Sequence, residues 1–147
     1  MTIFRIHSPA YAVFDTSGAA YRAGRWHLRG TRVVYAAQYV SLAALETLVH
    51  ANSQVLPPKL ITEIEIPDSL SIEYAAWMDL PNSQVFGSRW VQESRTAVLA
   101  VPSIVVQQIE LNFVINPAHP DFQQITPGLA RSFVFDGRFF PGVAAGV

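Results

Sequence analysis

Several short segments of the chain alternate hydrophobic and polar residues with the two-residue period of a half-buried β-strand. The segment 2–7 (TIFRIH) has this period. So does 60–66 (LITEIEI), in which Ile64 and Ile66 are predicted to face a core and the glutamates to face solvent. The segment 110–117 (ELNFVINP) alternates in the same way. Each of these three segments is therefore predicted to form a strand.

Three further apolar segments are also predicted to be strands: 32–37 (RVVYAA), 96–103 (TAVLAVPS) and 131–136 (RSFVFD). The first two are short, rich in β-branched residues and without polar alternation, which is typical of buried strands. The strand within 96–103 must finish at Pro102, because proline has no N–H to donate to a neighbouring strand.

The segment 42–51 (LAALETLVHA) has the spacing of an amphipathic helix, and Ser41 is its predicted N-cap. The predicted core-facing arc consists of Leu42, Leu45, Leu48 and Val49. Glu46 and His50 lie one helical turn apart at the border of that arc, whereas Thr47 is expected to point to solvent. This position would let the Glu46 carboxylate face a cleft between helix and sheet.

A second helix is predicted over 83–94 (SQVFGSRWVQES), although Gly87 weakens its helical propensity. Strands outnumber helices and do not alternate regularly with them, which favours an α+β fold over a doubly wound parallel sheet. Because no repeat, linker or composition break divides the chain, we expect a single compact mixed domain over residues 1–147.

The chain carries little charge, with 14% charged and 50% hydrophobic residues; soluble domains typically have about 25% charged residues. We therefore expect part of its apolar surface, including the tail 139–147 (FFPGVAAGV), to be covered by another protein or by a second copy. The net charge of −1 and the absence of a basic tail argue against direct nucleic-acid binding.

The sequence also predicts where the protein works. It has no cysteine, which suits a reducing compartment. Arg5 and His7 interrupt the place where a signal peptide would need its apolar core, and Pro102 breaks the most apolar run well short of a membrane span. A cytoplasmic protein without a membrane segment is expected.

Arginine is concentrated in one stretch, because four of the ten Lys and Arg residues lie within 18–37 (GAAYRAGRWHLRGTRVVYAA). A guanidinium binds phosphate through a planar fork, and glycine lets a ligand approach the backbone. Gly24, Arg25 and Trp26 combine these features with an indole. The indole would either stack on a ligand ring or fill the core beside the arginine.

Glu46 is the candidate carboxylate, and two other interpretations of it stay open. It is either a solvated glutamate beside an i,i+4 histidine or a metal ligand shared with His50. The sequence contains no HExxH, GxSxG, GxGxxG or GxxxxGK[ST] motif, so zinc peptidase, serine hydrolase, Rossmann and P-loop chemistries find no support. The remaining set is an anion-binding arginine, an aromatic ring and one carboxylate, with no metal expected.

Three segments in order resemble the RES domain, the toxin component of RES–Xre toxin–antitoxin modules. They are 24–37 (GRWHLRGTRVVYAA), 41–50 (SLAALETLVH) and 101–122 (VPSIVVQQIELNFVINPAHPDF). The resemblance implies an α+β fold like that of ADP-ribosyltransferase toxins. It also implies an enzyme that consumes NAD+ as a substrate and holds no permanent cofactor.

The family is named for Arg, Glu and Ser residues, and the resemblance assigns roles in this chain to positions that match its motifs. Arg25, Tyr35 and Glu46 would be catalytic. The NAD-binding set would comprise Arg25, Trp26, Tyr35, Ser103, Ser41, His50 and Asn116. Ser103 is the first choice for the family serine and Ser41 the second. His27 stands where many relatives have Asn.

The resemblance implies cleavage of the nicotinamide–ribose bond of NAD+, with transfer of ADP-ribose to water or phosphate. The alternative is transfer to a protein such as phosphoribosyl pyrophosphate synthetase, and a further alternative is a noncatalytic nucleotide-binding module. A cognate Xre-type antitoxin is the implied partner, and the apolar composition leaves a homodimer open.

Overall fold

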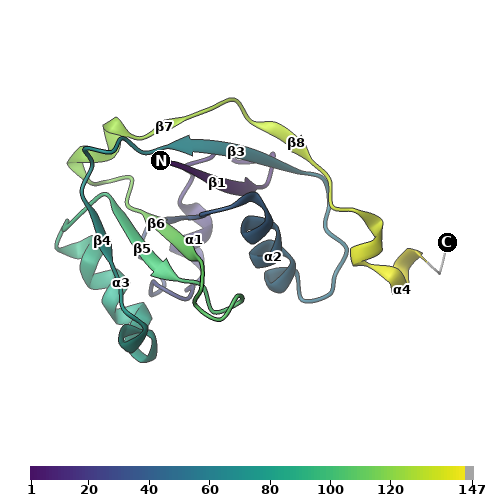
Figure 1. Cartoon of the computed structure of the whole chain (residues 1–147), viewed down its shortest axis with the longest axis horizontal. Helices are drawn as coiled ribbons and strands as arrows, with labels where there is room; N and C mark the ends of the chain where they lie inside the picture. Colours follow the sequence, from purple (N-terminus) through teal and green to yellow (C-terminus); the bar gives the residue numbers. More distant parts are fainter. Residues whose placement is uncertain (145–147) are drawn as a thin grey trace.

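A computed structural model describes residues 1–144 of the chain and is built around one eight-stranded sheet (Figure 1). The strands are β1 (Thr2–His7), β2 (Val34–Ala37), β3 (Lys59–Glu65), β4 (Ile72–Tyr74), β5 (Val98–Pro102), β6 (Leu111–Ile115), β7 (Thr126–Pro127) and β8 (Arg131–Phe133). The α-helices of the described part are α1 (Ser17–Tyr21), α2 (Val40–Ala51), α3 (Ser83–Gln92) and α4 (Pro141–Ala144). The mixture confirms the predicted α+β class. The last three residues of the apolar tail lie outside the described residues.

The strand order is β4-β5-β6-β2-β1-β3-β7, with β8 also paired to β3. Every pairing is antiparallel except that of β4 with β5. The order does not follow the chain, so segments far apart in sequence become neighbours. In particular, β2 lies between β1 and β6, which brings the arginine-rich stretch beside 110–117.

The core occupies both faces of the sheet, because successive residues of a strand point to opposite sides. In β5, Val98 and Ala100 join one apolar cluster with Ile3 and Phe113. Leu99 and Val101 join the other, which contains Trp26, Trp90 and Val114. All five residues of β5 are buried, which confirms the prediction of a buried strand ending at Pro102. The alternation over 60–66 is confirmed as well, with Ile64 and Ile66 buried and the glutamates exposed.

Helix α2 differs from its prediction in two respects. It begins at Val40 with Tyr39 as the N-cap, so Ser41 lies exposed inside the first turn and makes no capping bond. The predicted apolar arc is also wrong, because Leu45 is 40% and Val49 58% exposed. Only Leu42 and Ala43 are buried, against Phe4 and Ile6 of β1 and Ala37 of β2.

Helix α3 confirms the prediction over 83–94 and covers the second face of the sheet through Trp90. Gly87 lies directly against the backbone of Trp26: a Cβ atom on this glycine would be 1.7 Å from the Trp26 carbonyl oxygen. Gly87 is therefore a packing requirement between α3 and the arginine-rich loop. Within residues 1–144, no helix has the length and apolarity to cross a membrane.

Candidate active site

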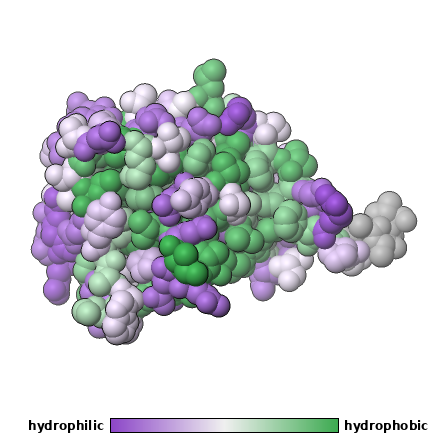
Figure 2. All heavy atoms as spheres, in the orientation of Figure 1, coloured by the Kyte–Doolittle hydropathy of each residue, from purple (hydrophilic) through white to green (hydrophobic). Residues whose placement is uncertain are grey.

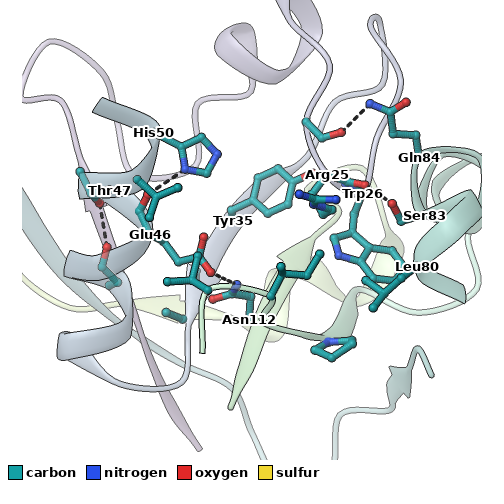
Figure 3. Close-up of a pocket in the computed structure, with 18 of the residues that line it drawn as sticks. Arg25, Trp26, Tyr35, Glu46, Thr47, His50, Leu80, Ser83, Gln84 and Asn112 are labelled. Carbon is teal, nitrogen blue, oxygen red and sulfur yellow. Dashed lines mark hydrogen bonds between the residues drawn. The ribbon is translucent and has the colours of Figure 1, made fainter. Parts of the chain in front are cut away.

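A cleft of about 910 Å³ opens between α2, strands β1 and β2, the arginine-rich loop and the start of α3. Figure 3 shows Glu46 and His50 projecting from α2 on one side, with Arg25, Ser83 and Gln84 on the other and Tyr35 between them. Five residues of α2 line the cleft: Ala43, Glu46, Thr47, Val49 and His50. Ala43, Glu46 and His50 are spaced three and four positions apart and share one helix face, with Thr47 and Val49 at its two borders. Thr47 thus borders the cleft, which corrects the expectation that it points to open solvent.

Two side chains hold the Glu46 carboxylate from behind. Ser103 Oγ, directly after β5, and Asn112 Nδ2, on β6, each donate a hydrogen bond of 2.7 Å to Oε1. No group in residues 1–144 donates to Oε2. The carboxylate is thus fixed by one oxygen and presents the other to the cleft. Ser103 is 1% exposed and does not line the cleft itself, and its hydroxyl is bonded to Glu46.

Tyr35 lies in the middle of β2 and turns its ring to the cleft. Its hydroxyl accepts the backbone N–H of Trp26 at 3.1 Å and contacts His27 Nδ1 at 2.7 Å. Burial raises the pKa of the Tyr35 phenol, with the backbone hydrogen bond and Arg25 acting in the opposite direction. The phenol is therefore neutral over the physiological range. It offers a ring face and a hydroxyl but no negative charge.

The arginine-rich loop is anchored to the start of α3. Ser83 Oγ donates to the carbonyl of Arg25, and Gln84 Nε2 donates to that of Gly24 at 2.9 Å. These bonds place the exposed Arg25 side chain at the cleft wall opposite Glu46 (Figure 3). Trp26 is 2% exposed and packs edge-to-face on Phe86. The indole therefore fills the core beside the arginine, and Trp26 is also one of the residues that line the cleft.

Arg5 is a cleft residue that the sequence analysis did not identify. Its Nη1 donates to the carbonyl of Tyr35 at 2.7 Å, while its Nε is buried without a hydrogen-bond partner in the described chain. Burial lowers the pKa of Arg5 to about 10, so the guanidinium stays charged at neutral pH. Because Arg5 lines the cleft, its guanidinium adds a positive charge to the wall that suits an anionic ligand. The alternation of 2–7 placed this residue on a strand but gave no sign of its chemistry.

Three other predicted site residues have different outcomes. His50 lines the cleft, and its Nδ1 is 2.7 Å from the Glu46 carbonyl. Ser41 is exposed and Asn116 is buried at 1% exposure, and neither lines the cleft. Asn116 accepts the Ala118 N–H and so shapes the turn after β6. Asn112, four residues earlier on the same strand face, is the asparagine that contacts Glu46.

The fold and the site together define a small α+β protein with a cleft lined by an arginine, a neutral tyrosine and a carboxylate. The RES domain family model matches residues 2–136, and the chain belongs to this family. It is 43% identical over 143 residues to a protein named Prs ADP-ribosylating toxin from Sphingobium sp., covering 87% of this chain and 88% of that protein. It is 34% identical over 152 residues to a Toxin Res from Yersinia enterocolitica, covering 94% and 99%.

A solved structure has the same fold. The chain superposes with a TM-score of 0.74 on a chain in the crystal structure of the M. tuberculosis MbcT–MbcA toxin–antitoxin complex. The superposition covers 98% of this chain and 88% of that one, at 12% sequence identity. The fold thus matches even where few side chains do.

Proposed function

We propose that this protein is a toxin that cleaves the nicotinamide–ribose bond of NAD+ and transfers the ADP-ribose. One observation carries the proposal: Arg25, Tyr35 and Glu46, from three separate elements, line a single cleft. Its volume of about 910 Å³ is within the range of roughly 300–1,000 Å³ typical of ligand pockets. The name of the Sphingobium relative, an ADP-ribosylating toxin, supports the same chemistry.

The residues fit a dissociative cleavage. Breaking the bond between the nicotinamide nitrogen and the ribose C1′ develops positive charge on the sugar, as in glycoside hydrolysis. The free Oε2 of Glu46 stabilises this cation or holds the ribose hydroxyls, while the Tyr35 ring stacks on nicotinamide. Arg25 binds the pyrophosphate, and Arg5 supplies a second cation. Nicotinamide leaves as a neutral molecule, so no strong general acid is required.

The acceptor of ADP-ribose has two candidates. Water or phosphate would make the protein an NAD+-depleting enzyme, with the acceptor forming the new bond to C1′ and losing its proton to solvent. A protein acceptor is favoured by one observation, the name Prs ADP-ribosylating toxin of the relative at 43% identity. In that case, phosphoribosyl pyrophosphate synthetase is the acceptor to test first.

Incubation of the purified protein with NAD+ tests both the activity and the acceptor. Rapid release of nicotinamide in buffer, faster when phosphate is added, identifies water or phosphate. Slow release that accelerates when a synthetase is added, with the mass of that protein rising by one ADP-ribose, identifies a protein acceptor. Recovery of intact NAD+ under all of these conditions would contradict the proposal and favour a noncatalytic nucleotide-binding module.

We also propose a cognate Xre-type antitoxin as partner and the cytoplasm, where NAD+ is available, as location. Figure 2 shows apolar residues across much of the middle of one face. Large side chains that stay exposed include Tyr74, Trp77, Met78, Ile109 and Leu129. Such surface supports a protein partner or a homodimer. Light scattering after co-expression with an Xre-type protein tests this, and a protein that stays monomeric and uncomplexed would contradict it.

Replacing Arg25 by lysine is expected to raise the KM for NAD+ about tenfold with a smaller change in kcat. Lysine keeps the charge but lacks the fork that binds two phosphate oxygens at once. Arg29→Lys is the matched control, because Arg29 packs over the Tyr21 ring and does not line the cleft. Steady-state kinetics of nicotinamide release measures both. Equal KM values for the two variants would exclude the proposed role of Arg25.

Replacing Ser103 by alanine is expected to lower kcat about tenfold, because Glu46 loses one of two donors to Oε1 and a hydrogen bond to a charged group contributes about 1.5–3 kcal/mol. Ser41→Ala should leave kcat unchanged, since Ser41 lies outside the cleft. The reverse order of effects would restore Ser41 as the functional serine.

A further inference from the structure

The buried imidazole of His27 has a hydrogen-bonding pattern that fixes its tautomer. Its Nε2 lies 2.9 Å from both the Ala19 and the Arg22 carbonyl oxygens. Carbonyls only accept, so Nε2 carries the hydrogen. In the neutral ring Nδ1 is then an acceptor, and the group that faces it at 2.7 Å is the Tyr35 hydroxyl. The phenol therefore donates to His27.

The Tyr35 hydroxyl is therefore hydrogen-bonded to two groups of the arginine-rich loop. The oxygen accepts the Trp26 N–H at 3.1 Å and gives its own hydrogen to His27. The ring of Tyr35 is thus tied at its far end to the loop that carries Arg25. Strand β2 holds the other end through its backbone pairing with β1 and β6.

The surroundings leave His27 and Tyr35 little freedom. His27 is 2% exposed and its ring centroid lies 5.6 Å from that of Tyr35. A Cβ atom on Gly24 would lie 2.7 Å from His27 Cε1 and 3.0 Å from the Tyr35 hydroxyl. The absence of a side chain at Gly24 therefore provides the room in which the two rings pack. His27 itself does not line the cleft.

We propose that His27 is a positioning residue for the reaction, which accepts the Tyr35 hydroxyl through Nδ1 and thereby sets the ring of Tyr35 relative to Arg25. The inference rests on the proposed function, because it acts through the contact of Tyr35 with the nicotinamide riboside. It gives a role to a residue that does not line the cleft. A ring displaced by about 1 Å can cost on the order of 100-fold in rate, so loss of the His27–Tyr35 hydrogen bond is expected to have a measurable effect on kcat.

Two substitutions of His27 test the roles of Nδ1 and Nε2 separately. His27→Asn places a carboxamide oxygen near the position of Nδ1 and removes the bonds made by Nε2. His27→Gln reaches toward the two carbonyls and removes the acceptor for Tyr35. We expect H27Q to lower kcat for nicotinamide release about tenfold or more, and H27N to stay within about threefold of the wild type.

The same substitutions in a Tyr35→Phe background show whether His27 acts through the phenol. Phenylalanine keeps the ring and removes the hydroxyl, so H27Q should then cost no further kcat. A full additional loss in that background would overturn the inference, since it would indicate a general packing effect. Equal losses for H27N and H27Q in the Tyr35 protein would overturn it as well, and so would an unchanged H27Q.

Nicotinamide release by the wild-type protein tests the proposed function separately from the role of His27. A wild-type protein that releases no nicotinamide overturns the proposed function and with it the inference. A wild-type protein that turns over NAD+ while H27Q matches it overturns only the role of His27. Thermal unfolding of each variant identifies any kcat loss that comes from an unfolded fraction.

Discussion

Replacing Glu46 by glutamine is expected to lower the kcat for nicotinamide release by about 100- to 1,000-fold, the usual cost of removing one electrostatic contact to a transition state. The substitution removes one negative charge and almost nothing else. The carboxamide oxygen can still accept from Ser103 and Asn112, which both donate to Oε1. The lost charge is the one that faces the cleft, where the ribosyl cation develops.

Because the two donors keep their acceptor, the E46Q protein should unfold at nearly the wild-type temperature and still bind NAD+. Glu63→Gln is the matched control, since Glu63 is exposed on β3 and paired with Arg131 at 2.9 Å, away from the cleft. An exposed pair of this kind contributes at most about 1 kcal/mol to stability. Nicotinamide release by E46Q at the wild-type rate would show that Glu46 has no part in the reaction.

Replacing Gly87 by alanine is expected to destabilise the protein by about 3 kcal/mol or more, the upper end of the cost of overpacking. Helix propensity alone predicts the opposite sign, because alanine in a helix interior is favoured over glycine by about 1 kcal/mol. Packing decides the sign here. The new Cβ would lie 1.7 Å from the Trp26 carbonyl oxygen, a backbone atom that cannot move without the loop.

Urea denaturation followed by circular dichroism measures this loss. Gly18→Ala in α1 is the matched control, because nothing lies within 4 Å of a Cβ at that helical position. G18A should be neutral or slightly stabilised, by up to about 1 kcal/mol. The surviving folded fraction of G87A should also show a raised KM for NAD+, since α3 anchors the Arg25 loop. A G87A protein as stable as the wild type would contradict the packing of α3 on Trp26.

The sequence predicted the strands better than the helix face. Each face of a strand in this sheet has a single environment, so the side chains either alternate between buried and exposed, as in β3, or are buried on both faces, as in β5. Both patterns can be recognised in the sequence. Helix α2 meets the sheet only through its first turns, and its remaining length borders a cleft. Leucines at 45 and 48 continue the apolar spacing past the part that packs on the sheet. The spacing therefore predicted a buried apolar arc along the whole helix, whereas only the first part of the helix packs on the sheet.

The site was predictable only in part. The resemblance to RES domains supplied Arg25, Tyr35 and Glu46, which the cleft brings together. Asn112 depends on the pairing of β2 with β6, in which it lies opposite Ala37. No local pattern reveals that register. Arg5 and His27 are polar residues whose bonds run inside the molecule, and hydrophobic periodicity carries no information on such bonds.

The arrangement of NAD+ in the cleft tests the central claim most directly. We suggest a crystal structure of the E46Q protein with NAD+, in which slow turnover would preserve the substrate. The account predicts that the ribose C1′ lies beside the residue 46 side chain, with nicotinamide against the Tyr35 ring and the pyrophosphate on Arg25. A nucleotide bound outside this cleft, or one that contacts none of these three side chains, would contradict it.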